Sequence, residues 1–168
     1  MRKIFTNTLI ALSVSSCSSL PGYIAPTAGD LSRVEIEKSF NTPIPGSTTV
    51  INKYKMNNSR KCFQDMGIID AKKFITVTDS NFLISEFNAN GTKVRSGEEL
   101  VLQITSISGP ISCTDYVGFI PQKDSDYKIK LSGTLTSSQS KCKAELWSKQ
   151  KNHVKYMKKK LTMFNVCK

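Results

Sequence analysis

The amino-acid sequence predicts a mostly β protein: an antiparallel β-sandwich, immunoglobulin-like in general build, or a small β-barrel, with at most a short helix. Three observations favour this class. Short runs alternate apolar and polar residues at period two, and turn residues separate these runs. Cysteines in the body of the chain lie far apart in the sequence. No long helical pattern with both caps occurs in the sequence, so the helical content is expected to be small.

The predicted strands are rich in apolar and β-branched residues. The first two are separated by residues 41–47, which contain two prolines and a glycine. Asn90 and Gly91 can supply the positive φ angles of a tight turn, so residues 82–87 are expected to form a hairpin with residues 92–95. A generous count gives eight or nine strands, and the clearest are 34–37, 48–55, 74–78, 81–87, 92–95, 100–104, 127–131 and 161–167.

Three further segments have a less regular pattern. Residues 60–73 carry apolar residues at near-helical spacing and are expected to form either a short helix or a loop. Residues 119–127, which end at Tyr127, are similar to the strand-turn-strand with a tyrosine that occurs in immunoglobulin-like sandwiches. Trp147 is the single tryptophan and is predicted to lie in the core.

The N-terminus carries the features of an export signal. Arg2 and Lys3 are followed by an apolar segment, residues 4–14, which is too short to span a bilayer. The next residues, Ser15-Ser16-Cys17, are small. With Val14, they resemble the lipobox of bacterial prolipoproteins.

That resemblance implies cleavage between Ser16 and Cys17, a diacylglycerol on the Cys17 thiol and acylation of the new α-amine. Residues 1–16 would then be a signal peptide and 17–30 a lipid-anchored tether, followed by a single β domain at 31–168. The alternative is an ordinary secretory peptide cleaved after a small-x-small set such as residues 13–15. In that case Cys17 would remain as a free thiol.

The parity of the cysteines favours the lipoprotein hypothesis. The chain has five cysteines, and assigning Cys17 to a lipid leaves four, an even set suited to disulfides in an oxidising compartment. Four cysteines permit three pairings, and the favoured one joins Cys113 to Cys142 and Cys62 to Cys167. Their spacings lack the close pairs of a zinc or redox motif, so neither a metal nor another cofactor is expected.

The resemblance also implies a location. The protein is expected at the cell membrane or the outer membrane, held by its lipid and facing the periplasm or the exterior. Ser18 follows the lipidated cysteine, where many Gram-negative lipoproteins retained at the inner membrane have Asp. If the source is Gram-negative, this favours the outer membrane.

The net charge of +11 is concentrated in a basic C-terminal segment, residues 141–168, which has nine lysines and one acidic residue. An anionic partner, either an envelope polymer or lipid headgroups, would be bound by lysines of this segment. The alternative is that residues 154–167 form the last hairpin, with Lys158–Lys160 at its tip, and that these lysines only protect an exposed edge. The candidate lysines are Lys149, Lys151, Lys155, Lys158, Lys159 and Lys160.

No catalytic constellation is evident in the sequence, so an enzyme is not expected. His153 is the only histidine and is predicted to lie on the surface. Motifs for nucleophilic hydrolysis, metal catalysis and nucleotide binding are absent from the sequence. The paired acids Glu98–Glu99 and Asp124/Asp126 fit solvated turns, and the two aspartates are too few for a calcium site.

Three hypotheses about function follow. The first is a lipid-anchored cell-envelope protein with a non-catalytic binding or structural role, whose partner is the membrane and another envelope component or protein. The second is a binder of an anionic envelope polymer, such as lipopolysaccharide, teichoic acid or an acidic glycan, through the basic segment. The third is a hydrolase that depends on carboxylates alone. No nucleic-acid partner is expected, because no recognised nucleic-acid module is present in the sequence.

Overall fold

The computed structural model describes residues 20–41, 47–54, 71–78 and 90–165. These residues form ten strands and, in the described ranges, no helix. The strands are β1 (Leu31–Asn41), β2 (Thr48–Tyr54), β3 (Lys72–Thr78), β4 (Thr92–Arg95), β5 (Leu100–Ser108), β6 (Ile111–Phe119), β7 (Ser125–Thr136), β8 (Gln139–Gln150), β9 (Met157–Lys159) and β10 (Thr162–Met163).

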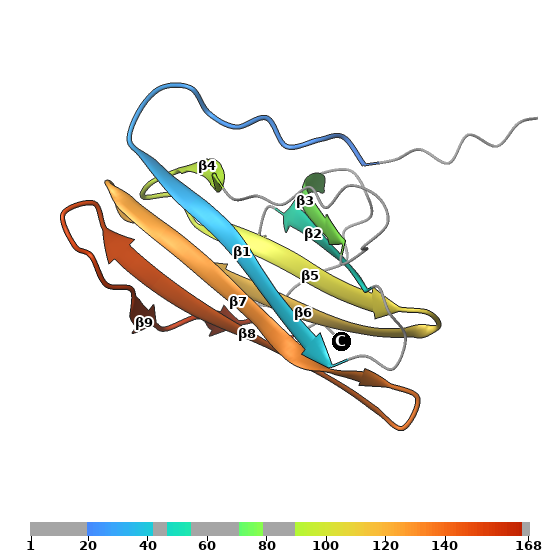
Figure 1. Cartoon of the computed structure of the whole chain (residues 1–168). Helices are drawn as coiled ribbons and strands as arrows, with labels where there is room; N and C mark the ends of the chain where they lie inside the picture. Colours follow the sequence, from blue (N-terminus) through green and yellow to red (C-terminus); the bar gives the residue numbers. More distant parts are fainter. Residues whose placement is uncertain (1–19, 42–46, 55–70, 79–89, 166–168) are drawn as a thin grey trace, which may run out of the picture.

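The strands form a β-sandwich, which confirms the first of the two predicted architectures (Figure 1). The first sheet has the order β4-β1-β7-β8-β9 and the second has the order β10-β6-β5-β2-β3. Three of the four edge strands are very short, since β4 has four residues, β9 three and β10 two. Short edge strands offer little free backbone to another chain.

One strand pairing differs from the expected antiparallel arrangement. β1 and β7 run parallel over nine residue pairs, from Arg33 opposite Asp126 to Asn41 opposite Thr134. Between β1 and β7 the chain forms β4 of the first sheet and four strands of the second sheet, so the two need not run antiparallel as the arms of a hairpin do. The first sheet is therefore mixed, whereas all pairings of the second sheet are antiparallel.

The core lies between the two sheets. β7 shows the period-two pattern most clearly, because Tyr127, Ile129 and Leu131 are buried while the residues between them are partly exposed. Val34 and Leu146 contribute from the neighbouring strands of the same sheet. Full burial of one such aliphatic or aromatic side chain contributes about 1.5–3 kcal/mol to folding.

A disulfide between Cys113 and Cys142 links the two sheets, with a Cα–Cα distance of 6.1 Å. Cys113 lies on β6 of the second sheet and Cys142 on β8 of the first. This pairing confirms one half of the favoured connectivity. Its expected partner bond, between Cys62 and Cys167, lies outside the described residues. A disulfide that closes a loop of this length stabilises a fold by about 2–4 kcal/mol.

The predicted C-terminal hairpin is wrong. β9 pairs with β8 in the first sheet, whereas β10 pairs with β6 in the second. Lys158 and Lys159 consequently lie within an edge strand rather than at a hairpin tip. Leu161, between β9 and β10, packs against the core as the chain crosses from one sheet to the other.

Other strand predictions have mixed outcomes. Most of the predicted strands are confirmed, but β6 and β8 were not predicted as strands. β4 pairs with β1, and its expected hairpin partner at residues 82–87 lies outside the described residues. The same is true of residues 60–70, the main part of the expected helix or loop.

Two aromatic predictions also have different outcomes. Tyr127 matches the expected turn arrangement, because the Gln122 backbone N–H donates a 2.8 Å hydrogen bond to the Tyr127 hydroxyl oxygen. The prediction that Trp147 lies in the core is wrong. In β8 the neighbouring Leu146 points inwards and is 2 % exposed, so Trp147 lies half-buried on the outer face of the sheet.

Candidate functional site

The outer face of the first sheet carries a network of opposite charges. Strand register creates this network, because Glu35 of β1 lies opposite Lys128 of β7, and Lys128 lies opposite Trp147 of β8. We call this surface the paired face. Its members are Arg33, Glu35, Glu37, Asp126, Lys128, Lys130, Lys143, Glu145, Trp147, Lys149, Tyr156 and Lys158.

Lys128 is the centre of the network on β7. Its Nζ lies 3.5 Å from a carboxylate oxygen of Glu35 and 3.2 Å from one of Glu37. Burial lowers the pKa of Lys128, but the two carboxylates more than offset this, so its pKa is above the usual value. In the same way, burial raises the pKa of Glu37 but the ammonium groups of Lys128 and Lys130 bring it below its ordinary value.

Glu145 of β8 is paired twice. Its Oε1 lies 2.6 Å from Lys143 Nζ and 2.9 Å from Lys158 Nζ, and its side chain is 19 % exposed. Hydrogen bonds from Lys143 and then Lys158 lower the pKa of Glu145 to about 2. Lys158, one of the six candidate lysines, therefore has a carboxylate partner within the protein.

Aromatic rings complete the paired face. The Tyr156 ring lies between two cations, with its centroid 5.4 Å from Lys128 Nζ and 5.1 Å from Lys149 Nζ. Lys149 Nζ also lies 3.9 Å from a carboxylate oxygen of Asp126. Cation–π contacts at partly exposed sites contribute about 0.5–1 kcal/mol each. A second candidate lysine, Lys149, is thus held by intramolecular contacts.

The remaining four candidate lysines form a different surface, which we call the basic edge: Lys151, Lys155, Lys159 and Lys160. They lie on the loop between β8 and β9, on β9, and directly after it, at one edge of the first sheet. All four are exposed, and none has an ion pair within the described residues. Val154 is 97 % exposed beside them.

The stretch before β1 contacts the domain. Gly22 forms a parallel bridge with Lys73 at the free edge of β3, where the Tyr23 N–H donates to Lys73 O at 2.8 Å and the Lys73 N–H donates to Pro21 O at 2.9 Å. The Tyr23 ring packs on Phe74 with a centroid distance of 5.1 Å. The segment expected to be a tether, residues 17–30, is therefore docked on the sheet at Gly22.

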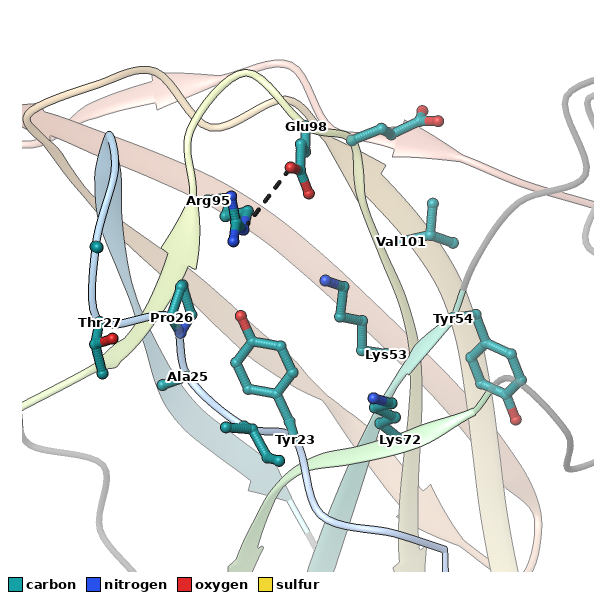
Figure 2. Close-up of a pocket in the computed structure, with 13 residues that line it drawn as sticks. Tyr23, Ala25, Pro26, Thr27, Lys53, Tyr54, Lys72, Arg95, Glu98 and Val101 are labelled. Carbon is teal, nitrogen blue, oxygen red and sulfur yellow. Dashed lines mark ion pairs between the residues drawn. The ribbon is translucent and has the colours of Figure 1, made fainter.

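A pocket of about 840 Å³ opens between residues 23–28, strands of the second sheet, and the end of β4 with the turn that follows it. We call it the Tyr23 pocket. Figure 2 shows that the polar ends of Tyr23, Lys53 and Arg95 turn towards the same central space, with the Arg95–Glu98 ion pair, 3.9 Å long, at the rim. No pattern in the sequence predicts this pocket, because its residues come together only when the stretch before β1 docks on β3.

A smaller pocket of about 330 Å³ includes Asp124 and Asp126. Asp126 is paired with Arg33 at 3.4 Å and with Lys149 at 3.9 Å, so its charge is already compensated. Asp124 has a φ of 52° in the turn before β7. Among the residues that the structure describes, no group of three or more metal-ligating side chains is present.

Several predicted residues lie outside the described ranges, namely Cys17, Cys62 and Cys167. His153 is exposed, as predicted. Within the described part of the chain, no helix has the length and apolar character needed to cross a membrane. No protein-family model, no curated protein and no solved structure matches the chain. A functional assignment therefore depends on the geometry of the chain itself.

Proposed function

We propose that this chain is a lipid-anchored protein of the bacterial cell envelope with a non-catalytic binding role, and that it binds an anionic envelope polymer through the basic edge. Lipopolysaccharide, teichoic acids and acidic glycans share the required chemistry, which is a repeated phosphate or carboxylate group. The anchor is assigned to Cys17, from the lipobox resemblance and the cysteine parity.

One observation carries the binding proposal. The candidate lysines divide into two that have acidic partners, Lys149 and Lys158, and four that have none within the described residues. An exposed ammonium group that has no carboxylate partner among the described residues is available to an external anion. Near an anionic surface each contributes up to about 1 kcal/mol, and salt reduces this contribution.

The geometry offers less support for a carboxylate-dependent hydrolase. Each described pocket has acids that are paired with cations, such as Glu98 with Arg95 and Asp126 with Arg33. Among the described residues only one acid in each pocket lacks an ion pair, Glu99 in the larger and Asp124 in the smaller, so neither pocket offers two unpaired carboxylates. A general acid requires a protonated carboxyl group, and a nearby cation favours the ionised form. We therefore favour a binding role.

The binding proposal is tested with a soluble form that lacks residues 1–17. Changing Lys155, Lys159 and Lys160 together to Gln should weaken its binding to lipopolysaccharide about tenfold or more at low salt, because three unpaired charges are lost. Affinity is measured by fluorescence titration over a range of salt concentrations. The native protein should show a steep salt dependence and the variant a shallow one.

A matched control removes the same charge elsewhere. Lys73, Lys93 and Lys141 are exposed lysines outside the basic edge, and changing all three to Gln should leave most of the affinity intact. Equal loss in both triple variants would show that only net charge matters. Unchanged binding in the basic-edge variant would contradict the proposal and favour simple protection of the sheet edge.

The anchor is tested separately, in cells that express the full chain. Labelled fatty acid should be incorporated into the native protein and not into the Cys17→Ala variant. Equal labelling of the two would overturn the anchor, and would leave the binding result unaffected.

A further inference from the structure

The Tyr23 pocket contains a half-buried ammonium group, that of Lys53. Lys53 of β2 is half-buried, and within the described residues no carboxylate lies within ion-pair distance of its Nζ. Its described contact is with the Tyr23 ring, whose centroid lies 5.1 Å from the Nζ. A partly buried charge with only a π contact keeps most of its capacity to bind an anion.

The surroundings of Lys53 increase this capacity. Burial lowers the pKa of Lys53 below its usual value; the Glu98 carboxylate opposes this, and the charges of Lys72 and Arg95 lower the pKa further. Three cations thus line one pocket and repel each other. An anion placed among them would relieve both the desolvation and the repulsion.

Apart from Thr27 and a second carboxylate, Glu99, the rest of the lining is apolar or aromatic. Ile24, Ala25 and Pro26 line it from the segment before β1, and Tyr54 and Val101 line it from β2 and β5. The volume of about 840 Å³ lies within the range of pockets that hold small molecules. Such a lining fits an apolar or aromatic body attached to the charged group.

We propose that the Tyr23 pocket binds a small amphipathic oxyanion, in which a phosphate or carboxylate group contacts Lys53, Lys72 and Arg95 and an apolar body lies against residues 24–26. This site is separate from the basic edge. Its cations come from β2, β3 and β4, whereas the basic edge follows β8 at the other edge of the first sheet.

Hexyl phosphate is a suitable probe, and binding to the purified full chain is measured by calorimetry. Inorganic phosphate and hexanol should each bind much more weakly than hexyl phosphate, because each lacks one half of the required chemistry. Hexylamine should not bind. Equal affinity for hexylamine and hexyl phosphate, or no binding of hexyl phosphate, would overturn the proposal.

Two adjacent lysines provide a matched pair of variants. Lys72 lines the pocket and Lys73 does not, although both are exposed on the same strand. The Lys72→Met variant should bind hexyl phosphate several-fold more weakly, and the Lys73→Met variant should bind it as the native chain does. Lys53→Met should cause the largest loss, about tenfold or more, because this ammonium group is the most buried of the three.

One variant should gain affinity, which a damaged fold cannot imitate. The Glu98 side chain is 62 % exposed and holds Arg95 at 3.9 Å. Glu98→Gln removes a negative charge from the rim and releases Arg95, so hexyl phosphate should bind several-fold more tightly. A loss of affinity in Glu98→Gln would contradict the assigned charge of the ligand.

The titration of Lys53 supplies an independent readout. Carbon-13 resonances of the lysine side chains should show that saturating hexyl phosphate raises the pKa of Lys53, and Lys53→Met identifies the resonance. An unchanged pKa on saturation would place the ligand elsewhere and overturn the proposal.

Such a ligand could be a lipid headgroup or a soluble oxyanion. A second binding experiment distinguishes the two, using phosphatidylcholine vesicles that contain or lack phosphatidic acid. Binding that depends on phosphatidic acid and on Lys53 assigns a lipid headgroup, whereas binding of hexyl phosphate alone assigns a soluble oxyanion. The triple Gln variant of the basic edge should bind hexyl phosphate normally, so failure here and failure of the polymer proposal are separable.

Discussion

The paired face and the basic edge draw their lysines from the same part of the chain but use them differently. Lys158 and Lys159 are consecutive residues of β9, yet Lys158 Nζ lies 2.9 Å from Glu145 and Lys159 has no ion pair within the described residues. Alternation along a strand places neighbouring residues on opposite faces. Strand register therefore decides which lysines are available to a partner.

The largest expected effect comes from replacing Leu146, the residue that determines which side chains of β8 point into the core. Leu146 is 2 % exposed in the core, and its burial keeps Trp147 and Glu145 on the paired face. Leu146→Ala should lower the free energy of unfolding by about 2–5 kcal/mol, because it leaves a cavity. Urea denaturation followed by circular dichroism measures the change.

The control for this substitution is the exposed apolar residue of the adjacent loop. Val154 is 97 % exposed, so Val154→Ala should change the free energy of unfolding by no more than about 0.5 kcal/mol. A comparable loss of unfolding free energy in the two variants would show that Leu146 does not point into the core.

A smaller effect separates the two lysines of β9. Lys158→Gln removes a partner of Glu145 and should lower the urea midpoint slightly, whereas Lys159→Gln should leave it unchanged, although both variants lose one positive charge. The prediction is checked by parallel urea titrations at low and high salt, since salt screens the exposed pair. A larger effect of Lys159→Gln would reverse the assignment.

The last test concerns the pH dependence of Glu145, the carboxylate that Lys158 shares with Lys143. The pKa of Glu145 is about 2 in the folded protein, below its ordinary value of 4.5. A carboxyl group with a lowered pKa stabilises the fold above the unfolded-state pKa, and this stabilisation is lost as the pH falls towards the folded-state pKa. The native chain should therefore be more stable than Glu145→Gln above about pH 5, with the difference disappearing near pH 2.

Urea midpoints of the two proteins across this pH range measure the difference. If it stays constant down to pH 2, the ionised form of Glu145 is not the source of the stabilisation. High salt should reduce the difference above pH 5, because the ammonium partners of Glu145 are partly exposed.

Strands could be predicted from the sequence where the period-two alternation of apolar and polar residues was strong. Tyr127, Ile129 and Leu131 alternate with polar residues and predicted β7, and the long-range cysteines led to the Cys113–Cys142 bond. β8 was missed because its outer positions carry lysines and a tryptophan. Among its inner positions only Leu146 is strongly apolar, so the alternation is weak.

Which distant strands pair with each other could not be predicted from the sequence. Nothing in β1 or β7 indicates that they pair in parallel, and nothing after β9 indicates that the chain crosses to β6 instead of turning back. The candidate lysines were found by composition, but their division into paired and unpaired sets depends on which acids lie across the sheet. The Tyr23 pocket depends likewise on one docking contact, between Gly22 and Lys73.

That docking contact also limits how the domain moves on its proposed anchor. From Cys17 to Pro21, the first residue with a backbone hydrogen bond to β3, there are four residue steps, which span at most about 14 Å when fully extended. A lipid on Cys17 would hold the β3 end of the sandwich close to the headgroups. The mouth of the pocket beside Tyr23 lies at this end of the domain, so it would stay within a short reach of the bilayer surface.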